Sequence, residues 1–268
     1  MAGVRGSVWL FLPNIIGYVR MATILGAALC GSDPARTPAF FALYAVSYLL
    51  DAFDGPAARY LNQTSRFGAV LDMVTDRVST ALLLCLLAHE ASAGQRHADA
   101  ALWLVLMMLD VGAHWVQMFS AGLAGAASHK ELKDEPALLT WYYRRTNLFV
   151  VCLLNETHLV MALMLARKEQ ALRGGIPLLG LPLPWGVPWG LEGESDPLIR
   201  SSLAAWLWAL TAAVCVLKQG ISLLHLVRAS QRVVSLDTQE CSASSASTTS
   251  KGSASGKKAS RSVSARRK

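Results

Sequence analysis

Long apolar stretches alternate with short polar segments along most of this chain. Six of the stretches reach about the ~20 residues that a helix needs to cross a bilayer, although polar residues interrupt several of them. They cover residues 8–29, 38–60, 67–90, 99–125, 138–166 and 199–228. The pattern predicts an all-α integral membrane protein with six transmembrane helices.

The C-terminal end of the chain follows a different pattern. From about Leu236 onward, Ser, Ala, Thr, Lys and Arg replace the apolar stretches, and such a segment cannot bury enough apolar surface to fold alone. We therefore expect a six-helix membrane domain over residues 1–235 and a basic, Ser-rich, disordered cytosolic tail over residues 236–268. The positive charges of the tail suit contact with anionic lipid. An equally good interpretation is a solvated tail whose charges keep this end of the chain on the cytosolic side.

The composition excludes an ordinary soluble domain, because 53% of the residues are hydrophobic and only 16% are charged. Lys and Arg gather in the loops after the second and fourth segments and in the tail, which predicts that these loops and both termini are cytosolic. The first segment lacks a small-residue cleavage site, so we expect a retained helix. The net charge of +7 comes largely from the tail, and no nucleic-acid partner is predicted.

Four aspartates lie close together on the second and third apolar segments. Asp51 and Asp54 are three residues apart, and Asp72 and Asp76 are four apart, so each pair lies on one face of its helix. Carboxylates without Cys or His neighbours are hard ligands that suit Mg²⁺ or Mn²⁺, and this number suits a two-metal site. Carboxylates beside long apolar stretches are costly unless a cation lies between them.

Basic residues offer a second explanation for the same four acids. They would then pair at the helix ends with Arg59, Arg66 and Arg77, without any metal. Arg20, inside the first apolar segment, also needs a partner, and one of these acids is the natural candidate.

The acids belong to a longer spacing pattern, Asp51-x2-Asp54-Gly55-x2-Ala58-Arg59-x8-Gly68-x3-Asp72-x3-Asp76. This pattern resembles the signature of the CDP-alcohol phosphatidyltransferase family at every position. Residues 11–20, Phe-Leu-Pro-Asn-Ile-Ile-Gly-Tyr-Val-Arg, and the stretch around the signature further resemble the eukaryotic phosphatidylinositol synthase branch. The resemblance extends to about residue 230. The Pro- and Trp-rich stretch 174–190 and the basic tail depart from it.

The resemblance implies a six-helix homodimer whose active site opens to the cytosol and transfers a phosphatidyl group from CDP-diacylglycerol to myo-inositol, releasing CMP. It assigns the metal ions, Mg²⁺ or Mn²⁺, to Asp51, Asp54, Asp72 and Asp76, and makes Asp76 the general base. It also implies a CDP-diacylglycerol site at Gly55, Ala58, Arg59, Ser65 and Gly68. We expect membrane lipid as surroundings and the endoplasmic reticulum as location, with the Golgi and the mitochondrion as alternatives.

The shared signature concerns the donor, so the acceptor site needs other residues. Lys130 and Arg144 are the candidates at the cytosolic ends of the fourth and fifth segments, and contact with lipid phosphates is the alternative for both. Uncharged inositol also calls for hydrogen-bonding groups. His114, Asn155 and Glu156 qualify if they face the interior.

Other functions fit parts of the pattern. Within the family, glycerol phosphate, serine or choline replaces inositol as acceptor. Outside it, four acids in a membrane suit a cation or proton transporter. A transporter would not require Gly55, Arg59 and Gly68 at fixed offsets from the acids, and an inactive relative would be expected to lack one of the aspartates.

Overall fold

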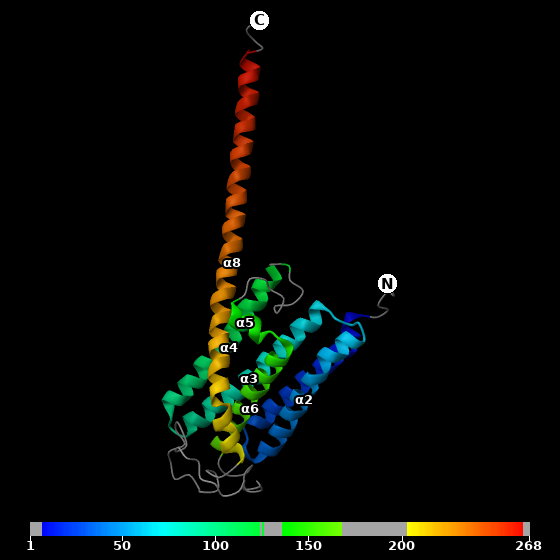
Figure 1. Cartoon of the computed structure of the whole chain (residues 1–268), viewed down its shortest axis with the longest axis vertical. Helices are drawn as coiled ribbons and strands as arrows, with labels where there is room; N and C mark the ends of the chain where they lie inside the picture. The colour runs from blue at the N-terminus through cyan, green and yellow to red at the C-terminus, as the bar shows by residue number, and fades with distance from the viewer. Residues whose placement is uncertain (1–6, 124, 126–135, 168–202, 265–268) are drawn as a thin grey trace.

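The computed structural model describes residues 7–123, 125, 136–167 and 203–264, and helices are the regular structure found there. The short 3₁₀ turns η1 (Val8–Leu10) and η2 (Pro34–Arg36) accompany a bundle of α-helices (Figure 1). The helices are α1 (Leu12–Gly31), α2 (Thr37–Tyr60), α3 (Arg66–Ala93), α4 (His97–Leu123), α5 (Ala137–Tyr142), α6 (Arg145–Ala166) and α8 (Leu203–Ser264). The predicted all-α fold class is confirmed.

Local sequence signals explain where the first three helices begin. Pro13 and Pro38 lie in the first turns of α1 and α2, where a missing backbone N–H costs nothing. Ser65 caps α3, because its Oγ accepts a hydrogen bond from the Gly68 backbone N–H at 2.9 Å. The cap fixes the start of the helix that carries Asp72 and Asp76.

The bundle has two apolar clusters. The larger one joins α1, α2, α3 and α6 through buried side chains that include Ile24, Phe40, Leu83 and Leu163. The smaller one joins α5, α6 and α8 through Leu139, Tyr142, Val151 and Ile221. The bundle also buries polar side chains, among them Arg20, Thr80, Asp110 and Glu156, which belong to the site described below.

Four helices in the described part of the chain are long and apolar enough to cross a membrane: α1, α4, α6 and the part of α8 from Trp206 to Ser242. The helices α2 and α3 carry the four aspartates and lack so apolar a stretch. Their 24 and 28 residues nevertheless give lengths of roughly 36 and 42 Å, more than the ~30 Å hydrocarbon core. The chain is an integral membrane protein by its apolar helices, and the count of six spans stays a prediction.

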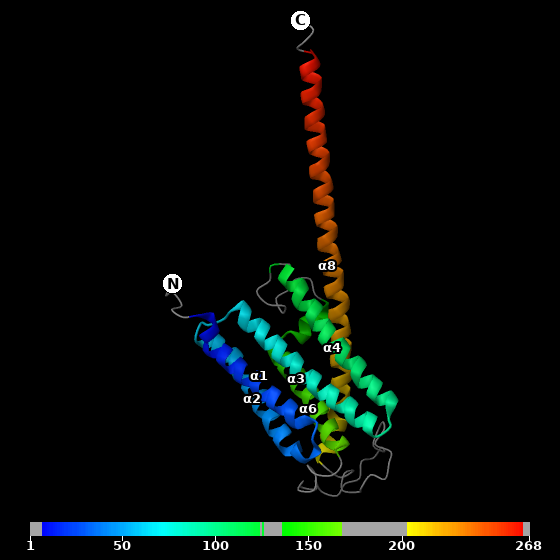
Figure 2. The same cartoon turned by 180° about the vertical axis from the view of Figure 1, so that it is seen from behind.

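The structure modifies two boundaries predicted from the sequence. The fifth segment, 138–166, is divided at Tyr143 and Arg144 into the short α5 and the long α6. The sixth runs on into the predicted disordered tail, because α8 is helical as far as Ser264 and projects beyond the bundle (Figures 1 and 2). The tail composition predicted disorder, but no proline interrupts residues 203–264. The division into two domains remains a prediction.

The start of α1, the junction between α2 and α3, and the far end of α8 all lie toward the same end of the bundle (Figures 1 and 2). Asp54 and Asp72 are each six residues from the helix ends at this junction, which corresponds to a depth of roughly 9 Å. The acids therefore lie near one end of the bundle. Lys130 and the stretch 174–190 lie outside the described residues.

Candidate active site

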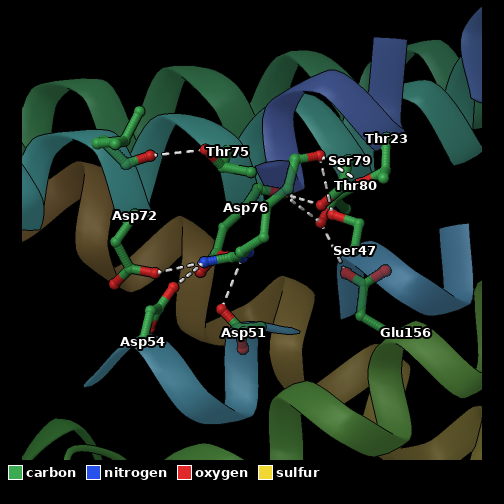
Figure 3. A network of polar contacts seen from close by, with 12 residues as sticks. Thr23, Ser47, Asp51, Asp54, Asp72, Thr75, Asp76, Ser79, Thr80 and Glu156 are labelled. Atoms are coloured by element: carbon green, nitrogen blue, oxygen red, sulfur yellow. Dashed lines mark hydrogen bonds and ion pairs between the residues drawn. The ribbon is translucent and has the colours of Figure 1, made fainter. Parts of the chain in front are cut away.

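The four signature aspartates converge on one point between α1, α2 and α3. Arg20 of α1 occupies this point and forms ion pairs with all four carboxylates, at 2.6 Å to Asp51, 2.5 Å to Asp54, 3.1 Å to Asp72 and 2.6 Å to Asp76. Figure 3 shows the carboxylates turned toward one another around a common centre. The prediction that Arg20 pairs with one of these acids is confirmed and extended to all four.

This arrangement fits divalent cations. Side-chain oxygens of Asp51, Asp72 and Asp76 lie within 4.8 Å of one another, and the Arg20 guanidinium shows that the group accepts positive charge from within the bundle. Four carboxylates around one guanidinium form a strongly acidic cluster. Oxygen donors at this density suit hard ions such as Mg²⁺ and Mn²⁺. The alternative pairing with Arg77 does not explain the acids, because Arg77 donates instead to Asp110 at 2.7 Å.

Replacing Arg20 tests whether it acts as the internal counter-ion of these acids. Arg20→Met is expected to destabilise the protein in EDTA by about 2 kcal/mol, or roughly 4–8 °C in Tm, because it removes the buried partner of four half-buried carboxylates. Divalent cations should narrow the difference from wild type, since they supply the missing positive charge. Thermal unfolding with EDTA and with Mg²⁺ measures both effects.

Arg36→Met is the matched control, because the Arg36–Asp33 pair is exposed on both sides. A surface pair of this kind contributes about 0–1 kcal/mol. Equal Tm values for Arg20→Met and wild type in EDTA would contradict the counter-ion role.

A groove of about 650 Å³ opens beside Asp54 and Asp72. All five residues predicted for the CDP-diacylglycerol site line it, namely Gly55, Ala58, Arg59, Ser65 and Gly68. A Cβ at Gly55 would lie 3.4 Å from the Arg59 guanidinium, so this side chain lies directly over the glycine. The structure thus places a cation and two carboxylates around a groove of a size suited to a nucleotide or a lipid headgroup.

The structure explains why position 68 requires a glycine, which the sequence alone did not reveal. A Cβ at this position would lie 2.8 Å from Oδ1 of Asn14, which is closer than real Cβ contacts allow. Asn14 is 1% exposed and donates to the Val8 backbone carbonyl at 2.6 Å. Gly68 therefore lets α3 approach the start of α1 in the floor of the groove.

Deeper in the bundle, polar side chains from distant parts of the sequence contact one another. Glu156 of α6 accepts hydrogen bonds from the Tyr44 hydroxyl at 2.5 Å and from the Thr80 hydroxyl at 2.6 Å. Asp110 of α4 accepts from Arg77 and lies 3.7 Å from Nζ of Lys218. Sequence reasoning missed Tyr44, Thr80 and Lys218, because a single hydroxyl or amine in a helix has no spacing signal.

The acceptor candidates have different positions in the structure. Arg144 is exposed just before α6 and lines neither the groove nor the smaller cavity described below, and its predicted role is not tested by this position. His114 packs against His225, with its Nδ1 2.8 Å from the Asp110 carbonyl, and it lines neither cavity. Asn155 and Glu156 face the interior, as an acceptor site would require.

The helical membrane bundle and its acidic site define a class of transferases. Residues 10–123 match the CDP-alcohol phosphatidyltransferase family, and the chain belongs to this family. Its members are generally dependent on divalent metal ions.

Within the family, the chain is similar to curated enzymes named CDP-diacylglycerol–inositol 3-phosphatidyltransferase. It is 35% identical to the Rattus norvegicus enzyme over 237 residues, covering 87% of this chain and 96% of that enzyme. It is 36% identical to the Schizosaccharomyces pombe enzyme over 237 residues, covering 87% and 93%. Enzyme 1 of Arabidopsis thaliana is 42% identical over 166 residues, covering 61% and 69%. No solved structure matches the chain.

Proposed function

We propose that this protein is a phosphatidylinositol synthase, which transfers the phosphatidyl group of CDP-diacylglycerol to myo-inositol and releases CMP. The observation that carries the proposal is the convergence of Asp51, Asp54, Asp72 and Asp76 on one cation-binding point beside the groove. The names of relatives that align with most of the chain support inositol as the acceptor.

The groove is the proposed donor site. The pyrophosphate of CDP-diacylglycerol is anionic, and the Arg59 guanidinium over Gly55 offers planar paired donors for phosphate oxygens. Ser65 also lines the groove, although its Oγ already accepts the hydrogen bond that caps α3. Its proposed part is therefore to fix the groove wall, with its hydroxyl proton free to reach a phosphate oxygen.

The reaction forms one P–O bond and breaks another. An inositol hydroxyl oxygen attacks the phosphorus next to the diacylglycerol, the bond from this phosphorus to the bridging oxygen breaks, and CMP leaves with that oxygen. Asp76 accepts the hydroxyl proton as general base. Mg²⁺ or Mn²⁺ held by the four aspartates would neutralise the phosphate charge. Arg20 balances part of the carboxylate charge within the same cluster.

The proposed setting is the endoplasmic reticulum membrane, where the donor lipid is made, with the site open to the cytosol and the protein as a homodimer. The shared position of the start of α1, the acidic site and the end of α8 supports a site on the side of both termini (Figure 1). Residence in the Golgi or the mitochondrion would be detected by fractionation of tagged protein.

CMP release from purified protein in detergent tests the function. The protein receives CDP-diacylglycerol and Mg²⁺ or Mn²⁺, with myo-inositol, glycerol 3-phosphate or serine in separate reactions. Release that depends on inositol is the expected result. Release with another alcohol alone would keep the family chemistry and contradict the acceptor, and the absence of release with all three would contradict the enzymatic proposal.

A further inference from the structure

A second cavity lies on the side of the acids away from the groove. It has a volume of about 40 Å³, room for about three water molecules, and Asp51 and Asp76 form part of its wall. The groove is lined by the other two signature acids, Asp54 and Asp72. The four carboxylates therefore separate two cavities, and the proposed general base, Asp76, borders the inner one. We call this inner cavity the polar chamber.

Cationic and acidic side chains both line the chamber. Three are cationic and three are acidic: Arg20, Arg77, Lys218, Asp51, Asp76 and Glu156. Hydroxyl groups lie among them, including those of Ser47, Tyr48 and Ser79. Such a lining offers both hydrogen-bond donors and acceptors, which suits a compound with several hydroxyl groups.

Glu156 is held in a fixed position in the wall of this chamber. Its two carboxylate oxygens each accept one hydrogen bond, from Tyr44 and from Thr80, and the residue is 8% exposed. Each oxygen has a second lone pair, so the carboxylate retains capacity for a further donor. Figure 3 shows Glu156 beside Thr80 and Ser47, on the far side of Asp76 from Asp72.

Asn155 supplies the observation that points to a ligand. The residue lines the chamber and is 3% exposed, and its Oδ1 has no hydrogen-bond partner among the described residues. A buried carboxamide oxygen without a partner is unfavourable, and nearly all such groups in proteins are satisfied. A hydroxyl donor inside the chamber would satisfy it.

We propose that the polar chamber is the acceptor subsite and that it binds a neutral polyol, with Asn155 and Tyr48 as binding residues. This inference rests on the proposed function, and it identifies where the acceptor lies. A hydroxyl held there would border Asp76, which takes its proton, while the donor phosphate lies across the acids in the groove. The chamber holds only about three water molecules, so a six-carbon polyol requires a lining side chain such as that of Arg20 to move.

Two variants with a matched control test the subsite. Asn155→Leu removes the carboxamide at similar volume, and Tyr48→Phe removes one hydroxyl with little risk to folding. Thr157→Val on the same helix is the control, because the Thr157 hydroxyl donates to the Leu153 carbonyl at 2.8 Å and does not line the chamber. The measurements are KM for myo-inositol, KM for CDP-diacylglycerol, and Tm.

Asn155→Leu is expected to raise KM for inositol on the order of tenfold, the usual effect of one lost hydrogen bond, with KM for CDP-diacylglycerol unchanged. Tyr48→Phe should give a smaller rise of the same kind, and Thr157→Val none. Inositol-dependent turnover with an unchanged inositol KM in both variants would overturn the subsite and leave the function standing. If Asn155→Leu fails to fold, the inositol KM of Tyr48→Phe alone tests the subsite. A wild-type protein without inositol-dependent turnover would overturn the proposed function itself.

Discussion

Asp76→Asn is expected to lower the rate of CMP release about a thousandfold while the protein still binds CDP-diacylglycerol. The carboxamide keeps the shape of the side chain, but it cannot accept the proton of the attacking hydroxyl, and general-base catalysis contributes about 10²–10⁴-fold. Asp76 borders the polar chamber, on the side opposite the groove, so donor binding should depend on it less than turnover does. Turnover and CDP-diacylglycerol binding are measured on the same preparation.

Asp99→Asn provides the comparison for this variant. Asp99 lies in the first turn of α4 and pairs with Arg96 at 3.3 Å, and it lines neither cavity. Its substitution should leave turnover near wild type. Full activity in Asp76→Asn would refute the base assignment, and equal loss of binding and turnover would indicate that Asp76 acts mainly through the metal site.

Removal of divalent metal is expected to reduce CMP release to background, and addition of Mg²⁺ or Mn²⁺ should restore it. The physical reason is the repulsion between the donor pyrophosphate and the four carboxylates gathered around Arg20, which divalent cations at the cluster would relieve. Titration of turnover with each ion after EDTA treatment identifies the preferred metal.

Asp51→Asn links this metal requirement to the cluster. It removes one of the three acids whose oxygens lie within 4.8 Å of one another, so half-maximal turnover should require more metal. The exposed Asp33 offers a control substitution that leaves the titration unchanged. Undiminished turnover in EDTA would contradict a metal-dependent reaction at this site.

The sequence predicted that the four aspartates lie together, because these residues are close along the chain. Asp51 with Asp54, and Asp72 with Asp76, each lie on one helix face at spacings of three and four, so local geometry brings each pair together. The groove residues from Gly55 to Gly68 belong to the same local segment, and the structure gathers all of them around one cavity. Short sequence separation made the aspartate pairs predictable, whereas the residues of the groove were expected from the resemblance to the family.

Helix ends were less predictable. The division of residues 138–166 into α5 and α6 has no proline or glycine to mark it, and α8 continues into a segment whose composition predicted disorder. Composition describes how much apolar surface a segment can bury, and it does not determine whether the backbone of a long helix stops at the membrane surface.

By itself, the sequence determined the membrane class and the pairing of the four aspartates on two helix faces, because apolar length and helical spacing are local properties. Only the tertiary structure decided that Arg20 lies among all four acids, and that Asn155, Glu156 and Lys218 surround a chamber behind Asp76. These residues are up to 198 positions apart, between Arg20 and Lys218. The helices that carry these residues are apolar on nearly every side, so hydrophobic periodicity cannot identify which face points inward. Only the packing of several helices against one another identifies that face.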